Sequence, residues 1–221
     1  ECTIDSENSG DGRAILVDTN ATFDNNDGTI KITHAGDTDI EFKSGTTSPK
    51  CPHNLTIDKS NNDVVTHGDL RIDNDLFIKI VDTSHSMRPS SASDTLTVIG
   101  DVTLNKGKLG ATTNYTSAIS FGSLTIDADG EYIATSDTTS ITSGDFDNTG
   151  TFTHNDGMVK FNHATNTQNI NENGTAQPTF YKLDNGQPAV GGATVIVWKD
   201  ITVIHTLSQT GGRYFQFKGD Q

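Results

Sequence analysis

The chain has 221 residues, of which 32% are hydrophobic and 21 are glycine, and its formal net charge is −14. This charge repels phosphate backbones and anionic membrane surfaces, so it argues against nucleic acid as a partner. No stretch approaches about 18 consecutive apolar residues, so we predict no membrane span. The apolar residues form short alternating runs, which argues against disorder and suits the thin core of a solenoid.

The first feature in chain order is the pair Cys2 and Cys51, the only cysteines in the sequence. An even pair is typical of a single disulfide in an oxidising compartment, so we predict a bond between them. Two unrelated thiols are the alternative. The chain begins at Glu1 rather than at methionine, so we expect a processed mature protein or a piece of a longer one.

Short β-strands are predicted along almost the whole chain, because apolar residues alternate with polar ones between glycine-containing turns. No window has sustained helical spacing with caps, so we expect little helix. Residues 82–93 interrupt this rhythm, and we expect a loop that leaves the stack there. The clearest strands are Ile30–Ile32, Leu76–Ile80, Leu96–Val98, Ile119–Phe121 and Val159–Phe161.

A short phrase recurs in the middle of the chain with its glycines 22 residues apart. The copies begin at Gly100, Gly122 and Gly144, and each is followed by a polar turn with a second glycine. A fixed period of this length is typical of stacked architectures, in which one unit cannot bury its apolar face alone. We therefore predict that Val102 stacks on Leu124, and likewise Leu104 on Ile126 and Leu124 on Phe146.

A longer repeat flanks these phrases. Residues Thr22–Pro49 align without gaps onto Thr151–Pro178 at an offset of 129, and 12 of the 28 positions are identical. Lys31 and His34 match Lys160 and His163. Biased composition alone rarely places such residues in register, so we interpret the match as a duplication.

These patterns predict an all-β fold, a parallel β-helix or β-solenoid of short strands, with an antiparallel β-sandwich as the alternative. We divide the chain into an N-terminal repeat block at 1–94, regular 22-residue coils at 95–150 and a C-terminal repeat block at 151–221. All three are expected to form one continuous stack.

The sequence contains no established catalytic motif, and we predict that the protein is not an enzyme. Asp145 and Asp147 alternate along a strand, as do Asp127 and Asp129, so each pair shares a face. Among 29 acidic residues such pairs arise by chance, and we interpret them as surface or turn acids. The repeat-equivalent His34 and His163 are expected to fill the same structural slot.

Calcium is the one metal for which we predict ligands, because two turns gather the oxygen donors that this hard cation prefers. Ordinary Asx turns are the alternative. The candidate ligands are Asp24, Asn26 and Asp27 in the first turn and Asp127, Asp129 and Glu131 in the second.

The phrases Gly144–Phe161 and Thr179–Leu183, the latter followed by Asp200–Val203, resemble those of repeat-rich extracellular β-helix surface proteins. These include secreted bacterial adhesin-like proteins and phage virion fibre proteins. The resemblance covers most of residues 22–210. It implies a structural or adhesive role outside the cell, at a cell surface or in a virion, and it carries over no catalytic residue.

Our first hypothesis is a structural or adhesive subunit of an extracellular filament, surface layer or virion fibre. The end segments Ile15–Val17 and Tyr214–Phe217 are apolar enough to pair with a neighbour, so we expect a homo-oligomer or polymer joined through end strands. The alternative is a polysaccharide-binding or depolymerising β-helix of the tailspike type, with glycans as partners. That role requires clustered aromatics and acids, whereas aromatics make up 7% of the chain and Trp198 is its only tryptophan.

Overall fold

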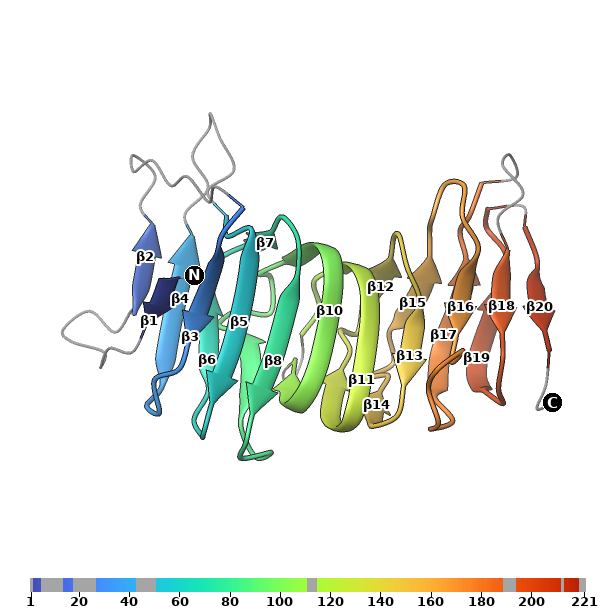
Figure 1. Cartoon of the computed structure of the whole chain (residues 1–221). Coiled ribbons are helices and arrows are strands. Elements are labelled where there is room, and N and C mark those ends of the chain that lie inside the picture. The colour runs from blue at the N-terminus through green and yellow to red at the C-terminus, as the bar shows by residue number, and fades with distance from the viewer. Residues whose placement is uncertain are drawn as a thin grey trace.

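The protein is described from a computed structural model, which describes residues 2–4, 14–17, 27–42, 51–110, 115–188, 194–211 and 213–218, with only the backbone for residues 2–4. These residues form 20 β-strands and no helix. The strands wind into an elongated solenoid of about 8 turns (Figure 1). Every pairing between described strands is parallel, so the β-solenoid prediction is confirmed and the antiparallel sandwich is wrong.

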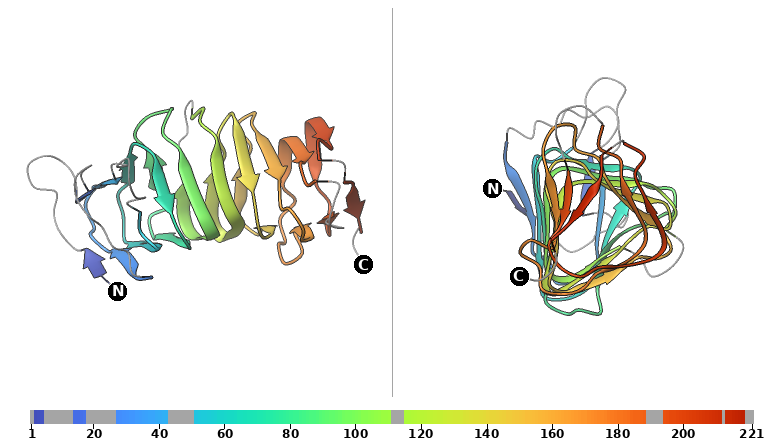
Figure 2. Two further views of the ribbon diagram at one scale, coloured as in Figure 1. Left: turned by 90° about the horizontal axis from the view of Figure 1, so that it is seen from above. Right: turned by 90° about the vertical axis from the view of Figure 1, so that its right-hand side faces the viewer.

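The strands fall into three columns, which form three faces around the core (Figure 2). The first face contains β1 (Cys2–Ile4), β3 (Thr29–Ile32), β5 (Asn54–Lys59), β8 (Leu76–Ile80), the middle of β10 (Leu96–Leu109) and of β11 (Ile119–Ile133), β13 (Phe146–Asn148), β16 (Gln168–Ile170), β18 (Val195–Val197) and β20 (Phe215–Phe217). The second face contains β2 (Ile15–Val17), β4 (Thr38–Phe42), β6 (Val64–His67), β9 (Ser86–Pro89), the ends of β10 and β11, and β14 (Thr151–Thr153). The third face contains β7 (Leu70–Ile72), the starts of β10 and β11, β12 (Thr138–Ile141), β15 (Met158–Phe161), β17 (Thr179–Asn185) and β19 (Thr202–Ser208).

The register of the central turns follows the 22-residue period. Val102 pairs with Leu124, and Leu124 with Phe146, while Leu104 pairs with Ile126, so the predicted stacking is confirmed. The inward members of these columns are at most 1% exposed. The parallel ladder therefore places each apolar residue directly on its counterpart one turn away.

Close approach between turns explains why the period is marked by glycine. A Cβ atom at Gly122 would lie 2.3 Å from the carbonyl oxygen of Gly100, one turn earlier. At Gly150 it would lie 2.2 Å from the carbonyl oxygen of Asp127. Because backbone atoms form these contacts and cannot swing away, the turns can stack at these points only if the residue has no side chain.

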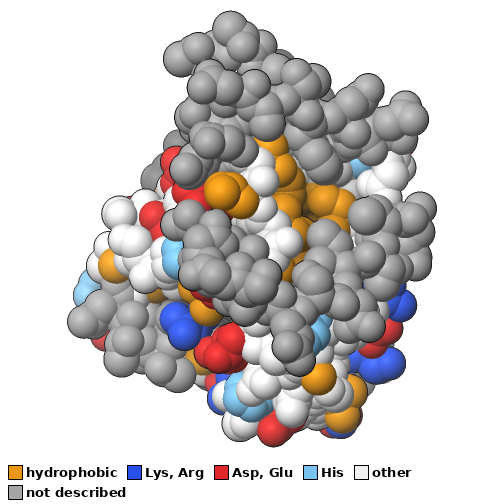
Figure 3. All heavy atoms as spheres, turned by 90° about the vertical axis from the view of Figure 1, so that its left-hand side faces the viewer, with side chains coloured by type: hydrophobic (Ala, Val, Ile, Leu, Met, Phe, Trp, Pro, Cys, Tyr) orange, Lys and Arg blue, Asp and Glu red, His pale blue; other side chains and the backbone are white. Residues whose placement is uncertain are grey.

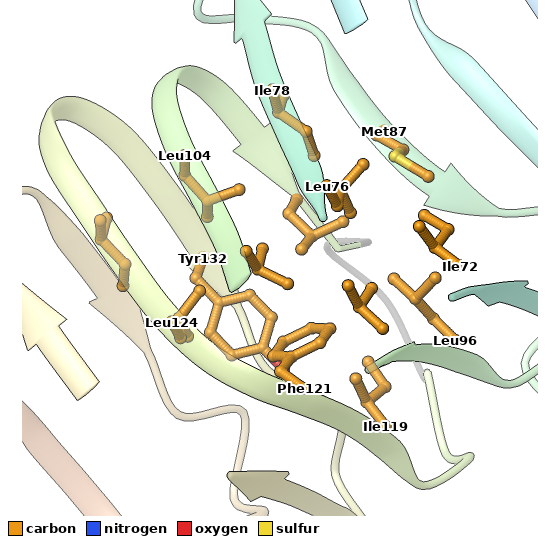
Figure 4. Packing of buried hydrophobic residues seen from close by; sticks show 14 of the residues in the cluster. Ile72, Leu76, Ile78, Met87, Leu96, Leu104, Ile119, Phe121, Leu124 and Tyr132 are labelled. Carbon is orange, nitrogen blue, oxygen red and sulfur yellow. The ribbon is translucent and has the colours of Figure 1, made fainter. Parts of the chain in front are cut away.

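The core is a single apolar column that runs along the solenoid axis. Inward side chains from the three faces meet there, and Figure 4 shows this packing around Leu76, Leu104 and Phe121. Phe121 packs edge-to-face on Tyr132, with ring centroids 5.7 Å apart. Burial raises the pKa of the Tyr132 phenol, whose hydroxyl lies 2.7 Å from the Thr139 hydroxyl.

The strands of the two repeat copies lie on different faces of the solenoid. β3 and β4 of the first copy lie on the first and second faces. Their counterparts at the 129-residue offset, β15 and β16, lie on the third and first faces. One copy is therefore related to the other by a shift along the axis combined with a rotation by one face.

A buried polar slot is shared by the two copies. Lys59 is 1% exposed, and its Nζ donates to Thr38 Oγ1 at 2.9 Å and to the carbonyl oxygen two residues before β4 begins at 2.7 Å. Gln187 is 0% exposed, and its Nε2 donates to Gln168 Oε1 at 2.9 Å and to the carbonyl oxygen two residues before β16 begins at 3.3 Å. Gln187 and Gln168 lie 128 and 130 positions after Lys59 and Thr38 rather than 129, so the two slots are alike in their place in the turn and not in aligned residues.

The expectation of a loop over residues 82–93 is wrong in its centre. β9 belongs to the stack and pairs with β6 on one side and β10 on the other. Met87 points into the core and is 1% exposed. Pro89 has no N–H to donate, but the pairing with β10 ends at Met87, so the proline is accommodated.

Candidate functional site

The outward aspartates form a hydrogen-bonded system that links successive turns. In seven cases an aspartate carboxylate accepts the backbone N–H of a residue 23 to 26 positions later, which lies on the next turn. Five of these aspartates directly precede the first residue of a strand. The seven are Asp37, Asp63, Asp69, Asp75, Asp145, Asp147 and Asp184.

This system accounts for the acidic pair at 145 and 147. Asp145 accepts from the backbone and side-chain nitrogens of Asn169 at 2.6 and 3.1 Å. Asp147 accepts from both nitrogens of Asn173 at 3.0 and 3.2 Å. Both carboxylates therefore hold the next turn in place, as the interpretation of surface or turn acids expects. The sequence signal was an aspartate directly before an apolar strand residue, as in Gly144–Phe146.

Asp184 is the most buried member of the system, with 1% of its surface exposed. Burial raises the pKa of this carboxyl, but hydrogen bonds from Thr210 and Ser208 outweigh that effect, and the net pKa lies below its usual value. The hydroxyl donors lie at 2.6 Å (Thr210) and 2.7 Å (Ser208). The Lys160 ammonium at 3.7 Å acts in the same direction. The carboxylate joins the last two turns of the third face.

Asp24 and Asn26 of the predicted calcium turn at 24–27 lie outside the described residues. Asp27 is described, and one carboxylate oxygen lies 3.5 Å from His53 Nδ1. Its φ of 55° is a left-handed conformation that aspartate adopts in turns.

The second predicted calcium set consists of Asp127, Asp129 and Glu131 on β11. Each carboxylate contacts a different residue of β10: Asn105 Nδ2 at 2.9 Å, Lys106 Nζ at 3.5 Å and Lys108 Nζ at 3.1 Å, respectively. Within the described ranges, no group of three or more His, Cys, Asp or Glu residues is arranged to hold a metal ion. Calcium binding stays a prediction, and a thermal melt with calcium against a chelator tests it; an unchanged midpoint would remove it.

The predicted disulfide falls partly outside the described residues, since the side chain of Cys2 is not described. Cys51 is 2% exposed, and its Sγ lies 3.0 Å from Asp73 Oδ2. Burial, reinforced by this carboxylate, raises the pKa of Cys51 to about 12. Such a thiol is a poor nucleophile at neutral pH, and its pairing with Cys2 stays a prediction.

The repeat-equivalent histidines both fold back over the turn that follows them. His163 Nδ1 accepts the backbone N–H groups of Thr165 at 3.0 Å and Asn166 at 2.7 Å. The His34 ring lies over Gly36, where a Cβ would come within 2.5 Å of Nε2. His163 therefore caps its turn, and the His34 ring lies over the equivalent turn of the first copy.

Sequence reasoning missed an outward ladder of rings in the C-terminal block. His154, Tyr181 and His205 lie on successive turns, with ring centroids 5.6 and 4.8 Å apart and interplanar angles of 23° and 32°. The His154 and Tyr181 rings are stacked, and the His205 ring is tilted against Tyr181. The residues are widely spaced in the sequence, and only the winding of the chain brings them together.

A pocket bordered by Met87, Leu109 and Tyr115 has a volume of about 10 Å³, which is about enough for one water molecule. The Tyr115 hydroxyl donates to the carbonyl oxygen of Asp94.

The two ends of the described solenoid differ in apolar exposure. At the C-terminal end Ile204, Leu207 and Phe217 are 55%, 49% and 57% exposed. At the N-terminal end, onto which Figure 3 looks, Leu16 is 40% exposed, whereas the inward Val17 is only 8% exposed. Among the described residues, apolar side chains are therefore more exposed at the C-terminal end than at the N-terminal end.

No known protein family, curated protein or solved structure matches the chain. In the part of the chain that the structure describes, no helix is long and apolar enough to cross a membrane.

Proposed function

We propose that the chain is a structural or adhesive subunit of an extracellular filament, surface layer or virion fibre, and that it self-assembles through end strands. The observation that carries the proposal is the exposure of the inward Leu207 and Phe217 in the last described turn, where no described strand pairs with the outer edges of β19 and β20. An uncovered strand edge readily pairs with another chain. The acidic, polar exterior and the resemblance to surface β-helix proteins support a location outside the cell or in a virion.

We further propose that the protein has no catalytic activity. The acidic pair with the best spacing for acid–base chemistry, Asp145 and Asp147, is engaged by Asn169 and Asn173. Carboxylates that already accept backbone N–H groups are poor general acids, because these hydrogen bonds favour the charged form.

Sedimentation velocity over a wide concentration range tests the proposal. We expect the sedimentation coefficient to rise with concentration as copies associate. A monomer that never associates would count heavily against a self-assembling subunit.

The alternative is a polysaccharide-binding or depolymerising β-helix, favoured by the outward rings of His154, Tyr181 and Trp198 in the C-terminal block. Against it, the Tyr181 ring is already stacked on His154, and the Lys218 ammonium lies 3.7 Å from the centroid of the Trp198 ring. A glycan array and a sugar-release assay separate the two functions. Retention on a glycan or release of sugar would favour the alternative.

A further inference from the structure

One junction inside the stack, between β13–β15 and the turn that follows them, has few strand pairs. On the first face β13 and β16 share a single pair, Phe146 with Ile170, whereas β11 and β13 share three. On the second face β14 pairs with β11, and no described strand pairs with its other edge. Residues 171–178 instead run from β16 to β17 without forming a strand. Only the third face keeps a full ladder here, the four pairs of β15 and β17.

Asparagine side chains replace part of the missing ladder. Asn171 Oδ1 accepts the backbone N–H of Asn148 at 2.8 Å, where a neighbouring strand would offer a carbonyl oxygen. Asn171 is 0% exposed and has a left-handed φ of 56°, which asparagine tolerates. The replacement is incomplete, because Asn148 Oδ1 is buried and has no hydrogen-bond partner within the described structure. An unpaired buried oxygen weakens the junction further.

Two carboxylates hold the outer side of the same junction. Asp145 accepts both nitrogens of Asn169, and Asp147 accepts both nitrogens of Asn173. We call these four residues the clamp. Gln168 Nε2 adds donation to two carbonyl oxygens of the preceding turn, at 3.0 and 2.8 Å. Since hydrogen bonds to a charged acceptor are the stronger kind, the clamp carries a larger share of stability here than where strands pair fully.

The turns beyond the junction keep ladders of their own. β16 and β18 share three pairs, and β17 and β19 share five. In a stacked fold each turn contacts only its neighbours, so partial opening occurs where an interface between turns is weak and leaves both sides intact. The strands from β16 to β20, which we call the C-terminal unit, therefore have the contacts needed to move together.

We propose that the C-terminal unit opens as one body at the clamp, while the strands up to β15 stay stacked. Opening breaks the contact between the Phe146 and Phe180 rings, whose centroids lie 5.4 Å apart, and uncovers Phe146, which is 0% exposed in the closed molecule. This conformational change does not depend on self-assembly, since every group at the junction belongs to one chain.

Trp198 offers a first test, because it is the only tryptophan and lies in the C-terminal unit. Its Nε1 donates to Asn169 Oδ1 at 2.8 Å. In urea at low protein concentration, we expect the fluorescence transition at a lower midpoint than the circular dichroism transition, which reports on all strands. Coincident transitions would show that the chain unfolds in one step and would overturn the proposal.

Amide hydrogen exchange measured by mass spectrometry distinguishes opening of a unit from fraying of the chain end. We expect one common protection factor from β16 to β19, whereas fraying gives protection that rises steadily from β20 inward. Asp147→Ala removes both hydrogen bonds to Asn173 and should raise exchange in the unit at least about tenfold. Asp75→Ala is the matched control, because its carboxylate accepts from Asp101 beside the four pairs of β8 and β10. It should leave exchange from β16 to β19 unchanged.

A disulfide across the clamp supplies the closing experiment. Asp145 and Asn169 directly precede the paired Phe146 and Ile170, so their Cα atoms lie about 4.8 Å apart, within disulfide range. In the double variant Asp145→Cys, Asn169→Cys, exchange from β16 to β19 should be at least about tenfold slower when oxidised than when reduced. Circular dichroism verifies that each variant keeps its strands. A steady gradient of protection in the unaltered chain, or equal exchange in the oxidised and reduced double variant, would overturn opening at the clamp.

Discussion

The two copies of the repeated block differ mainly in what lies on their C-terminal side. In the first copy β10 covers β8, and Leu76 is 1% exposed; in the second nothing within the described chain covers β19, and the equivalent Leu207 is 49% exposed. Leucines in equivalent register therefore meet two different environments. The comparison teaches that each turn of a solenoid contributes only half of a residue's burial, and the next turn contributes the rest.

The largest expected effect comes from truncating these two leucines. Leu76→Ala leaves a cavity in a covered column and should lower the free energy of unfolding by about 2 to 5 kcal/mol. Leu207→Ala removes a half-exposed side chain and should cost less than about 1 kcal/mol in the monomer. Urea denaturation at low protein concentration measures both, and equal losses would contradict the assignment of covered and open ends.

The next effect concerns the buried carboxylate of the second copy. Asp184→Asn removes the charge that accepts from Ser208 and Thr210, and should cost about 1.5 to 3 kcal/mol at neutral pH. The native pKa of Asp184 lies below its unfolded value, so its contribution is present above that value and is lost as the pH falls through the native pKa.

Urea denaturation at neutral and at acidic pH tests whether the Asp184 carboxylate stabilises the fold. Asp184→Asn should lose less stability than the unaltered chain when the pH is lowered, because it lacks the titrating carboxylate. Asp156→Asn, at a side chain that is 75% exposed, is the control. An unchanged acid dependence in Asp184→Asn would show that the carboxylate does not link the turns energetically.

A smaller effect concerns the pH dependence of stability that the buried Lys59 causes in the polar slot of the first copy. Burial lowers the pKa of Lys59 from 10.5 to about 8, although Asp37 and Asp63 act in the opposite direction. Between these two pH values the unfolded chain holds a proton that the native chain lacks, so stability should rise with pH, by an amount of the order of 1 kcal/mol.

Lys59→Gln, which copies the residue at 187, should abolish this rise, and Gln187→Lys should introduce a second one. Lys79→Gln, at a lysine 43% exposed, serves as the control. Melting temperatures over this pH range measure the effect, and a rise that persists in Lys59→Gln would assign it to another group.

The smallest effect compares the repeat-equivalent lysines. Lys31 contacts Asp58 at 3.0 Å, and its hydrogen bond is the main cause that holds the pKa of Asp58 below its usual value. Both side chains are partly exposed, so Lys31→Gln should cost less than about 1 kcal/mol. Lys160→Gln, beside the buried Asp184, should cost more. Urea denaturation at low salt measures both, and the reverse order would contradict the difference in burial between the two aspartates.

Periodicity made the stack predictable. The glycine spacing predicted the register of Val102, Leu124 and Phe146, because a parallel ladder repeats the same contact at every turn. The strand formed by Ser86–Pro89 escaped prediction, because a single inward methionine and a terminal proline produce no clear alternation. The candidate site was predicted less well: the interpretation of Asp145 as a turn acid agrees with its contacts, but the His154–Tyr181–His205 ladder was not foreseen.

The sequence by itself determined the all-β class, the parallel stacking and the duplication, since each depends on patterns that repeat along the chain. Only the tertiary structure decided that the second copy is rotated by one face, that seven aspartates link consecutive turns and that Leu207 and Phe217 are exposed in the last described turn. These features depend on contacts between residues a turn or more apart, whose polar partners follow no fixed period. Burial at the end of a solenoid likewise depends on the neighbouring layer rather than on the residue itself.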